Sequence, residues 1–579
     1  MPPRNQSDNF HKRMVVLTVF LLLFLIVMVG RLFTLQVVSG SYYKELAGSQ
    51  YARKSKLTAS RGEIKINDKL SNVPYAVATN IEKQIVWADP RAITDIDKTA
   101  ELLSPIIKID VEELKPKMSD KTKKYVQLKR QLTDEEVEEI AKLELPGIAF
   151  DAETTRFYPE KSFLSQVLGF VGYKGDDKVG LYGLERYFEK DLAGINGVLQ
   201  EDKDTSGAWI FGSKREFIPA VDGTNLLLTI DKNIQYQAER ILKDAVAEHQ
   251  ADSGSLIVMD PKTGAILSMA NHYASDPEYD PNQYNKATDP DVYNNMATVG
   301  SYEPGSIFKP LTMAAAINEG KVTAETKYVD TGFIDVDGFK IKNSDELAHG
   351  EQTMTQVLEE SLNTGAIFAK EQIGNETFFS YVKKFGFGKA TGIELPETPG
   401  NLDNLRGNIK VNYDTATFGQ GISVTPIQLV QAFSALANGG KMVKPHIVQA
   451  EVHPDGRTEE TKPANTVQVI DAKTASTITG MLTSVVEVGH GKRAGVPGYY
   501  IAGKTGTAQV SRKDSQGYEE NNNIGSFIGY GPVEDPRFVM LVRINHPRTV
   551  KFAETTAAPA FGKLAQFMLS YFNIPPTRK

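Results

Sequence analysis

Three short segments of the sequence carry the side chains of a serine acyltransferase. A serine has a lysine three residues later, a second serine has an asparagine two residues later, and a lysine heads a threonine–glycine run. They are EPGSIFKP with Ser306 and Lys309, ESLNTG with Ser361 and Asn363, and KTGT with Lys504, Thr505, Gly506 and Thr507. Each match alone occurs by chance in any long chain. Together and in this order they predict one active site.

The chemistry of this site depends on a neutral lysine. A serine hydroxyl is a weak nucleophile at neutral pH and needs an adjacent base. A lysine serves as that base when burial or a nearby cation lowers its pKa. Pro304-Gly305 breaks the chain before a helical segment, so Ser306 is expected at a helix N-terminus with Lys309 one turn along. Lys504 supplies the cation if its strand lies against that helix.

Each motif taken alone also has a purely structural interpretation. Ser306 alone could be an N-cap, Ser361 with Asn363 a turn at a helix end, and Lys504 a solvated strand residue. For one motif this interpretation would be favoured, but for all three together it is not.

The third motif also matches a phosphate-binding loop. Residues 498–505, GYYIAGKT, satisfy G-x-x-x-x-G-K-T. Such a loop needs a buried strand before it and a helix after it. Here GKRAGVP precedes Gly498, and TGTAQV follows Lys504 with few helix formers. The alternative of a nucleotide-binding ATPase therefore rests on the motif match alone, because the flanking segments do not predict the strand and helix that such a loop needs.

Composition excludes several other classes of chemistry. The chain has 579 residues, a net charge of −7 and no cysteine. There is no basic signature for nucleic acid, and thiolate catalysis, disulfides and cysteine metal sites are excluded. The eight histidines form no H-E-x-x-H motif, so no metal is expected. Glu394 and Glu397 suggest an alternative function, a hydrolase in which a glutamate positions the water that hydrolyses the acyl-enzyme. We expect them instead to be surface carboxylates.

The N-terminus predicts a membrane anchor. Residues 14–30 are seventeen residues without charge, and as a helix they rise ~26 Å, slightly less than a hydrocarbon core. Extension into LFTLQVV gives an anchor over 14–36. Basic residues such as Lys12 and Arg13 precede it, which predicts that 1–13 is cytoplasmic and the rest lies outside. A cleaved signal peptide is the alternative, but the apolar run is longer than such peptides usually carry.

The remaining pattern predicts an α+β protein. Residues 37–215 are expected to form a mixed pedestal domain, with Asp110 and Thr133 opening helices through capping boxes. From residue 216 to 579 strand-like segments stand at both ends of a helix-rich middle, which predicts one central, mostly antiparallel sheet flanked by helices. The expected strands are residues 223–231, two within 253–271, and three between 499 and 546; the expected helices include 232–249 and a last one near 555–572.

Beyond the three motifs, the chain resembles the class B, high-molecular-weight penicillin-binding proteins nearly end to end, and most of all their FtsI-type division or elongation transpeptidases. The resemblance rests on the single anchor and on a series of segments. They are RGEI (61–64), RFYPEKSFLSQVLGFVG (156–172), GLYGLERYFEKDLAGINGVLQ (180–200), DGTNLLLTIDKNIQ (222–235), FGQGISVTPIQL (418–429) and ALANGG (435–440). After RGEI the family usually has an Asp-Arg-Asn-Gly turn, whereas this chain reads KINDKLSN.

The resemblance implies a D,D-transpeptidase that cross-links peptidoglycan stem peptides. Ser306 attacks the amide between two terminal D-alanines, D-alanine leaves, and an amine of a neighbouring stem resolves the acyl-enzyme; β-lactams acylate the same serine. Asn363 holds Lys309 and the substrate amide, and Ser361 relays a proton to the leaving amine. The N–H groups of Ser306 and Thr507 form the oxyanion hole. The carboxylate is held by Lys504, Thr505 and Thr507, and Gly506 leaves room for the substrate.

The resemblance also implies partners and location. It implies no metal or organic cofactor, a single-pass protein of the plasma membrane, and a SEDS-type glycan polymerase with other divisome or elongasome proteins as partners. Alternatives are a D,D-carboxypeptidase or β-lactamase, in which water replaces the amine, and a scaffold that is acylated without turnover. The sequence leaves open septation versus elongation, the acceptor amine, the oligomeric state, the β-lactam affinity and the loop after RGEI.

Overall fold

The computed structural model describes residues 6–43, 52–175, 177–202, 215–407, 409–462, 466–511, 517–550 and 552–578. The chain divides into two compact units. The first comprises Met1–Ala59 and Gly194–Asp222, and the second comprises Ser60–Ala193 and Gly223–Lys579.

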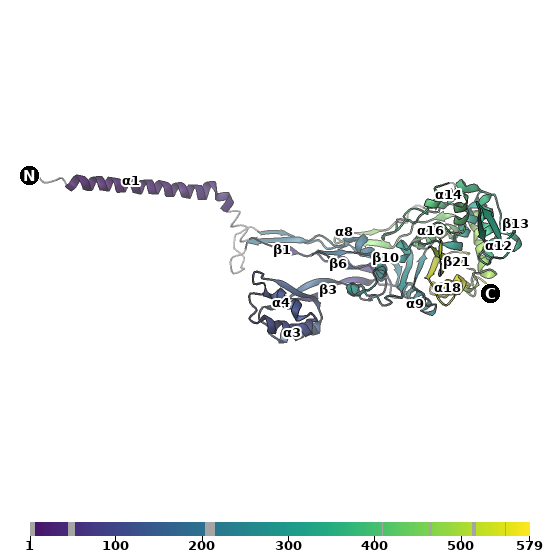
Figure 1. Ribbon diagram of the computed structural model, residues 1–579, viewed down its shortest axis with the longest axis horizontal. Helices are drawn as coiled ribbons and strands as arrows, with labels where there is room; N and C mark the ends of the chain where they lie inside the picture. The colour runs from purple at the N-terminus through teal and green to yellow at the C-terminus, as the bar shows by residue number, and fades with distance from the viewer. Residues whose placement is uncertain are drawn as a thin grey trace, which may run out of the picture. The chain divides into compact units, whose positions relative to one another are not determined.

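The first unit contains the apolar helix expected at the N-terminus. Helix α1 runs from Gln6 to Phe33 and continues into the π-helical turn η1 at Thr34–Val38 (Figure 1). Within Phe10–Val38 the most apolar window of 18 residues has a mean hydropathy of 2.8, and none of that window is buried. The segment is therefore long and apolar enough to cross a membrane. The same unit holds a small antiparallel sheet of β1 (Ala52–Leu57), β8 (Gly197–Asp202) and β9 (Arg215–Ile218).

The N-terminal part of the second unit is built on a mixed seven-stranded sheet. Its order is β19-β18-β10-β2-β3-β4, with β5 also paired to β3. These strands are β2 (Ile64–Asn67), β3 (Tyr75–Ala88), β4 (Val126–Leu132), β5 (Ile148–Phe157), β10 (Asn225–Asp231), β18 (Val448–Val452) and β19 (Thr458–Glu460). Helices α3 (Ile96–Ile107), α4 (Val111–Ser119) and α5 (Asp134–Lys142) bury a separate small core with β3 and β4.

The two expected capping boxes have different outcomes. Thr133 and Glu136 form the box at the start of α5, with both reciprocal hydrogen bonds present. The box at Asp110 is wrong, because the side chain of Asp110 makes no capping hydrogen bond to α4. Spacing finds a helix start, but whether the cap side chain turns inward depends on local packing.

The RGEI segment is fixed by a buried ion cluster. Arg61 and Arg156 both bind the carboxylate of Glu185, each at 2.6 Å, and Glu185 is fully buried. Arg61 also binds Glu189 at 2.7 Å. Since a buried charge needs compensation, these pairs tie β2, β5 and helix α7 (Gly183–Tyr187) together whatever the altered sequence after Ile64.

The three sequence motifs lie on and around a five-stranded sheet. Its order is β12-β11-β23-β22-β21, antiparallel throughout. The strands are β11 (Ser253–Met259), β12 (Ile266–Tyr273), β21 (Ala502–Ser511), β22 (Tyr518–Gly531) and β23 (Phe538–Asn545). The central antiparallel sheet predicted from the sequence is thus present, and the expected strands all occur in it or in β10.

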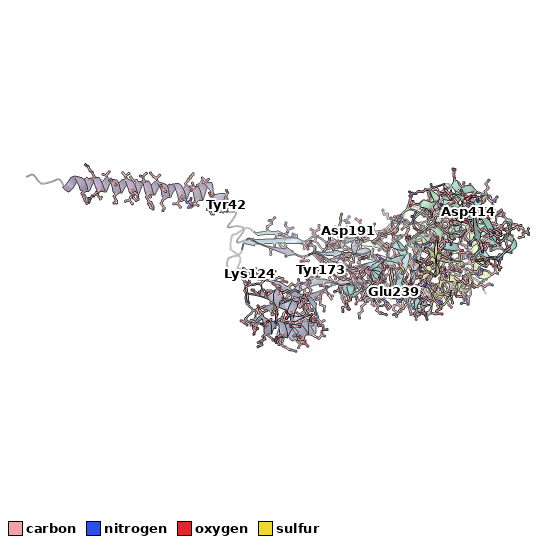
Figure 2. All side chains as sticks on the ribbon, in the orientation of Figure 1. Tyr42, Lys124, Tyr173, Asp191, Glu239 and Asp414 are labelled. Carbon is pink, nitrogen blue, oxygen red and sulfur yellow. The ribbon has the colours of Figure 1, made fainter. Side chains whose placement is uncertain are left out.

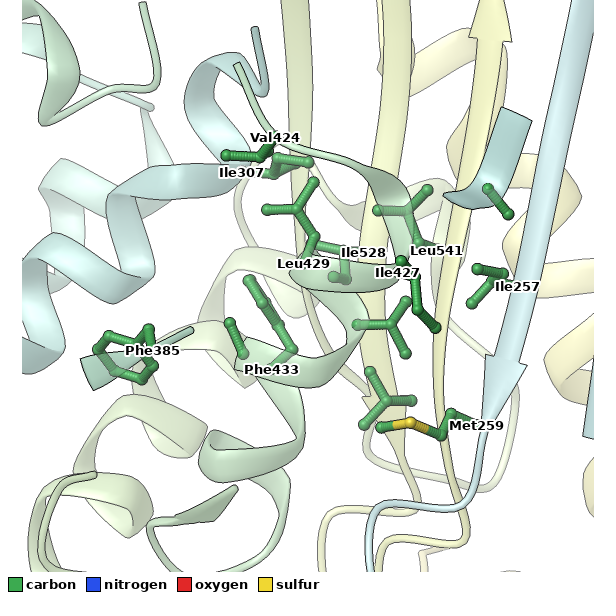
Figure 3. Packing of buried hydrophobic residues seen from close by; sticks show 14 of the residues in the cluster. Ile257, Met259, Ile307, Phe385, Val424, Ile427, Leu429, Phe433, Ile528 and Leu541 are labelled. Carbon is green, nitrogen blue, oxygen red and sulfur yellow. The ribbon is translucent and has the colours of Figure 1, made fainter. Parts of the chain in front are cut away.

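Alternation along these strands divides the core into two layers. On one face Leu256, Phe527 and Val542 pack against helices α9 (Lys232–Glu248) and α18 (Ala557–Tyr571). On the other face Ile257, Ile528 and Leu541 pack against helix α16 (Pro426–Ala437) through residues such as Leu429 (Figure 3). Both expected helices are confirmed, and the sheet is buried on both sides.

The helices of the middle segment complete the second layer. They are α11 (Lys309–Asn318), α12 (Met354–Glu359), α13 (Asn363–Glu371), α14 (Gly374–Lys384), α15 (Lys410–Ala416) and α17 (Ala472–Glu487). A buried ion pair between Lys370 and Asp414, the latter labelled in Figure 2, ties α13 to α15. The hairpin of β14 (Phe333–Val336) and β15 (Phe339–Lys342) and the pair β13 (Lys327–Asp330) and β16 (Gly350–Thr353) flank α13.

Candidate active site

Ser306 lies in a 3-10 turn, η4 (Gly305–Phe308), that leads directly into α11. The sequence predicts a helix that begins at Ser306, but α11 begins at Lys309. Ser306 is half-buried, whereas Lys309 is fully buried. Within the described residues the hydroxyl of Ser306 makes no hydrogen bond, so this accessible side chain is open to a ligand.

Strand β21 passes directly over this turn because two glycines have no side chain. A Cβ on Gly506 would lie 2.8 Å from Cγ2 of Ile307 and 3.1 Å from the carbonyl oxygen of Pro304. Gly305 has φ of +63°, and its Cβ would lie 3.2 Å from the carbonyl oxygen of Thr507. The sequence predicts that Gly506 leaves room for a substrate along this strand. Its missing side chain also lets the strand approach the serine turn closely.

The hydroxyl of Ser361 links the two lysines. Nζ of Lys309 donates to Ser361 Oγ at 3.1 Å and also to the Ser361 carbonyl oxygen, while Nζ of Lys504 donates to the same Oγ at 3.0 Å. Ser361 lies between α12 and α13 with φ of +60°, in the left-handed region. A non-glycine residue there is uncommon and is typical of a functional site.

Burial shifts the pKa of both lysines downward. For Lys309 burial and then the positive charge of Lys504 hold the pKa well below its ordinary range, against a smaller opposite effect of Asp345. For Lys504 burial lowers the pKa to about 7, opposed by Glu360. Two ammonium groups that share one hydroxyl repel each other, so we assign the neutral form to Lys309 and the charged form to Lys504.

Asn363 takes a different position from the one expected. Its Nδ2 donates to the carbonyl oxygen of Lys342 at 2.8 Å, and its backbone N–H donates to Oδ1 of Asn343 at 2.9 Å. No hydrogen bond joins it to Lys309 among the described residues. In this state Asn363 links the N-terminus of α13 to the end of β15 and the residue after it.

The two threonines of the third motif face different neighbours. Oγ1 of Thr505 lies 3.5 Å from Nζ of Lys504, and Thr505 is buried. Oγ1 of Thr507 accepts a hydrogen bond from the N–H of Ala553 at 3.2 Å. Both lie on β21, the last strand of its sheet, whose other edge has no strand partner among the described residues.

Two alternatives lose their structural basis. Lys504 and Thr505 lie within the extended strand β21, whereas a phosphate-binding loop requires a helix there. Glu394 and Glu397, which the sequence predicts to be surface carboxylates, are partly exposed, and both bind backbone groups. Oε2 of Glu394 accepts from the N–H of Ile447, and Glu397 accepts from the N–H groups of Thr391 and Gly392, so both fix loops.

Sequence reasoning missed one polar residue near Ser306 in the chain. Glu303 directly precedes the Pro-Gly-Ser turn, and its carboxylate accepts from the hydroxyl of Tyr518 at 3.1 Å and the N–H of Gly421 at 3.2 Å. Its position three residues before Ser306 was visible in the sequence. The approach of β22 and of the segment around Gly421, far away in the chain, was not.

Two family models match this chain. The family described as "Penicillin binding protein transpeptidase domain" matches residues 254–566, and "Penicillin-binding Protein dimerisation domain" matches residues 56–228. The chain is 36% identical to stage V sporulation protein D of Bacillus subtilis, over 99% of this chain and 88% of that protein. It is 31% identical to peptidoglycan D,D-transpeptidase FtsI of Escherichia coli, over 99% and 95%.

Solved structures give the same result. Penicillin-binding protein 3 of Mycobacterium tuberculosis, complexed with aztreonam, has a TM-score of 0.69 at 26% identity, with 90% of this chain and 99% of that chain covered. A peptidoglycan synthetase of Bifidobacterium adolescentis has a TM-score of 0.71 at 27% identity, with 91% and 98% covered.

Proposed function

The chain belongs to the class B penicillin-binding proteins of the FtsI type, and from this premise we propose that Ser306 is the nucleophile of its peptidoglycan D,D-transpeptidase reaction. The enzyme is a serine acyltransferase of cell-wall synthesis that β-lactams acylate. The observation that carries the assignment of residues is that the Ser361 hydroxyl accepts hydrogen bonds from two buried lysines, Lys309 and Lys504.

The acylation step follows from these groups. Neutral Lys309 takes the proton of Ser306 as its Oγ attacks the carbonyl between the two D-alanines. The N–H groups of Ser306 and Thr507 receive the developing oxyanion, with each donor contributing ~3 kcal/mol in comparable sites. Ser361 passes a proton to the leaving amine of D-alanine, and charged Lys504 with Thr505 and Thr507 binds the terminal carboxylate. Asn363 must turn from Lys342 to contact the substrate amide.

Deacylation consumes an amine rather than water. A neighbouring stem peptide supplies the amine, which attacks the acyl carbon. The ester bond to Ser306 breaks, and the proton of the amine passes through Lys309 and Ser361 to the leaving Oγ of Ser306. Glu394 and Glu397 are engaged with backbone N–H groups, which removes the two carboxylates considered for holding a hydrolytic water. This supports transfer over a carboxypeptidase or β-lactamase activity.

The test is covalent labelling of the full-length protein with a fluorescent penicillin. Ser306→Ala should abolish labelling, because no other hydroxyl lies on the turn under β21. The matched control is Ser301→Ala, an exposed serine five residues away, which should label like the wild type. Labelling that survives in Ser306→Ala would remove Ser306 as the nucleophile.

The protein is anchored to the membrane through α1. We place its first thirteen residues in the cytoplasm and everything after residue 36 outside, with 37–215 as a pedestal and 216–579 as the catalytic domain. A SEDS-type glycan polymerase in the same membrane is the partner that fits a transpeptidase without a polymerase domain of its own among the segments identified in this chain.

A further inference from the structure

Glu303 is a half-buried carboxylate without a cation. Its two oxygens accept one hydrogen bond each, from the hydroxyl of Tyr518 and the N–H of Gly421, and both donors are neutral. Among the described residues no lysine, arginine or histidine forms an ion pair with it. Burial raises the pKa of the Glu303 carboxyl above its ordinary value, and the two hydrogen bonds oppose this only in part. A buried charge without a partner is costly, and a ligand with a positive charge would compensate it.

Strand β21 orders the groups of the site along one line. Lys504 at its start reaches Ser361, and Gly506 packs against Pro304 and Ile307 of the nucleophile turn. Farther along, Ser511 pairs with Tyr518, whose hydroxyl binds Glu303. Through Tyr518, Glu303 is therefore linked to the C-terminal end of β21. Lys504 lies near the other end of the strand, and the turn with Ser306 packs between them.

A donor stem peptide that follows this edge has a defined direction. Extended peptides bind by adding a strand to a free sheet edge, and β21 offers one. In the proposed reaction the terminal carboxylate is bound at Lys504 and the scissile carbonyl lies at Ser306. The upstream residues must then continue toward Ser511. Since a strand rises ~3.3 Å per residue, the residue before the two D-alanines comes within side-chain reach of that end of the strand.

We propose that Glu303 binds the cationic amino group on the side chain of the residue that precedes the two D-alanines in the donor stem peptide. The inference rests on the proposed transpeptidase function. Where the amine that forms the cross-link is on the side chain of this residue, a donor that has not been linked through it carries the same free amine. A carboxylate at this place selects donors whose amine is still free over stems that have already been linked through it.

The test compares two donors on the full-length protein in detergent. One is Nα-acetyl-L-lysyl-D-alanyl-D-lactate with a free ε-amine, and the other is its Nε-acetylated form. The readout is kcat/KM for the release of D-lactate, which reports acylation alone. The wild type should prefer the free amine by about 10-fold or more, as expected for a hydrogen bond between charged groups. Glu303→Gln keeps the size of the side chain and should bring the preference close to one.

Two further variants sharpen the result. Glu303→Asp keeps the charge on a shorter side chain and should retain part of the preference. Glu325→Gln neutralises an exposed carboxylate away from the motifs and should retain all of it. A wild type without preference, or a Glu303→Gln enzyme that keeps it or slows both donors equally, would overturn the proposal. So would a change confined to transfer onto an added amine, which would assign Glu303 to the acceptor.

Failure of this inference is distinguishable from failure of the proposed function. Fluorescent-penicillin labelling of the same Glu303→Gln preparation reports the nucleophile and the folded state without any lysyl side chain in the probe. Labelling with a lost or retained donor preference decides only the role of Glu303. Wild-type labelling that does not depend on Ser306 would reject the transpeptidase assignment itself.

Discussion

At the scale of single residues, the main question is which of two buried lysines carries a proton. Lys309 and Lys504 both reach the Ser361 hydroxyl, and burial disfavours the charge on each. In the proposed reaction Lys309 must be neutral to act as a base, whereas Lys504 on β21 must be charged to bind a carboxylate. Ser361 adopts a left-handed backbone conformation that places its hydroxyl between them.

These shifts predict a bell-shaped pH profile for acylation by benzylpenicillin. Protonation of Lys309 at low pH removes the base, so the rate falls on the acid side, far below the ordinary lysine pKa of 10.5. Loss of the Lys504 proton removes the carboxylate partner, so the rate falls as pH rises through about 7. The second-order rate constant, measured by stopped flow, reports these free-enzyme values.

The control for the alkaline limb is Lys504→Arg. A guanidinium stays charged at every accessible pH, so the alkaline limb should disappear while the acid limb remains. A wild-type rate that climbs steadily from pH 6 to pH 9 would contradict the assignment of the charged state to Lys504.

At the scale of elements, the site depends on how closely β21 approaches the turn η4. Gly506 permits this contact, and the nearest atoms are Cγ2 of the buried Ile307 side chain and the backbone groups Ile307 N and Pro304 O. A side chain at position 506 would push the whole strand, with Lys504 and Thr507, away from Ser306.

Gly506→Ala should therefore slow acylation strongly. The new Cβ would lie 2.8 Å from Cγ2 of Ile307, and a displacement of the strand by a fraction of an ångström should lower the rate by about 10- to 100-fold. Benzylpenicillin acylation kinetics measure it. Gly480→Ala is the control, because this exposed position in α17 has no atom within 4 Å of a Cβ. It should keep the rate and stabilise the protein by about 0.5–1 kcal/mol, and equal rates for both variants would contradict the close contact.

Elements were more predictable from the sequence than their contacts. Alternation and helical spacing gave β10, β11, β12 and α9 because these patterns are local. The three motifs gave Ser306, Lys309, Ser361 and Lys504 because their order is distinctive. The side chain of Asn363, the neighbours of Glu303 and the reason for Gly506 depend on segments more than a hundred residues apart or on side-chain rotamers. No local pattern encodes them.

At the scale of the whole molecule, the orientation across the membrane can be tested cleanly because the chain contains no cysteine. Lys473→Cys on the exposed surface of α17 should react with a membrane-impermeant maleimide in intact cells. His11→Cys near the start of α1 should react only after the cells are opened. The reverse pattern, or equal labelling of both, would contradict the proposed topology.

The five-stranded sheet draws its strands from two distant stretches, residues 253–273 and residues 502–545, with β23 inserted beside β11. Synthesis must therefore reach β23 before β11 can pair with it. Such long-range pairing is slow, and until it happens the early hairpin of β11 and β12 exposes apolar faces that favour aggregation. The penicillin-binding site thus forms late in synthesis, and a nascent chain that stalls before β21 cannot react with penicillin.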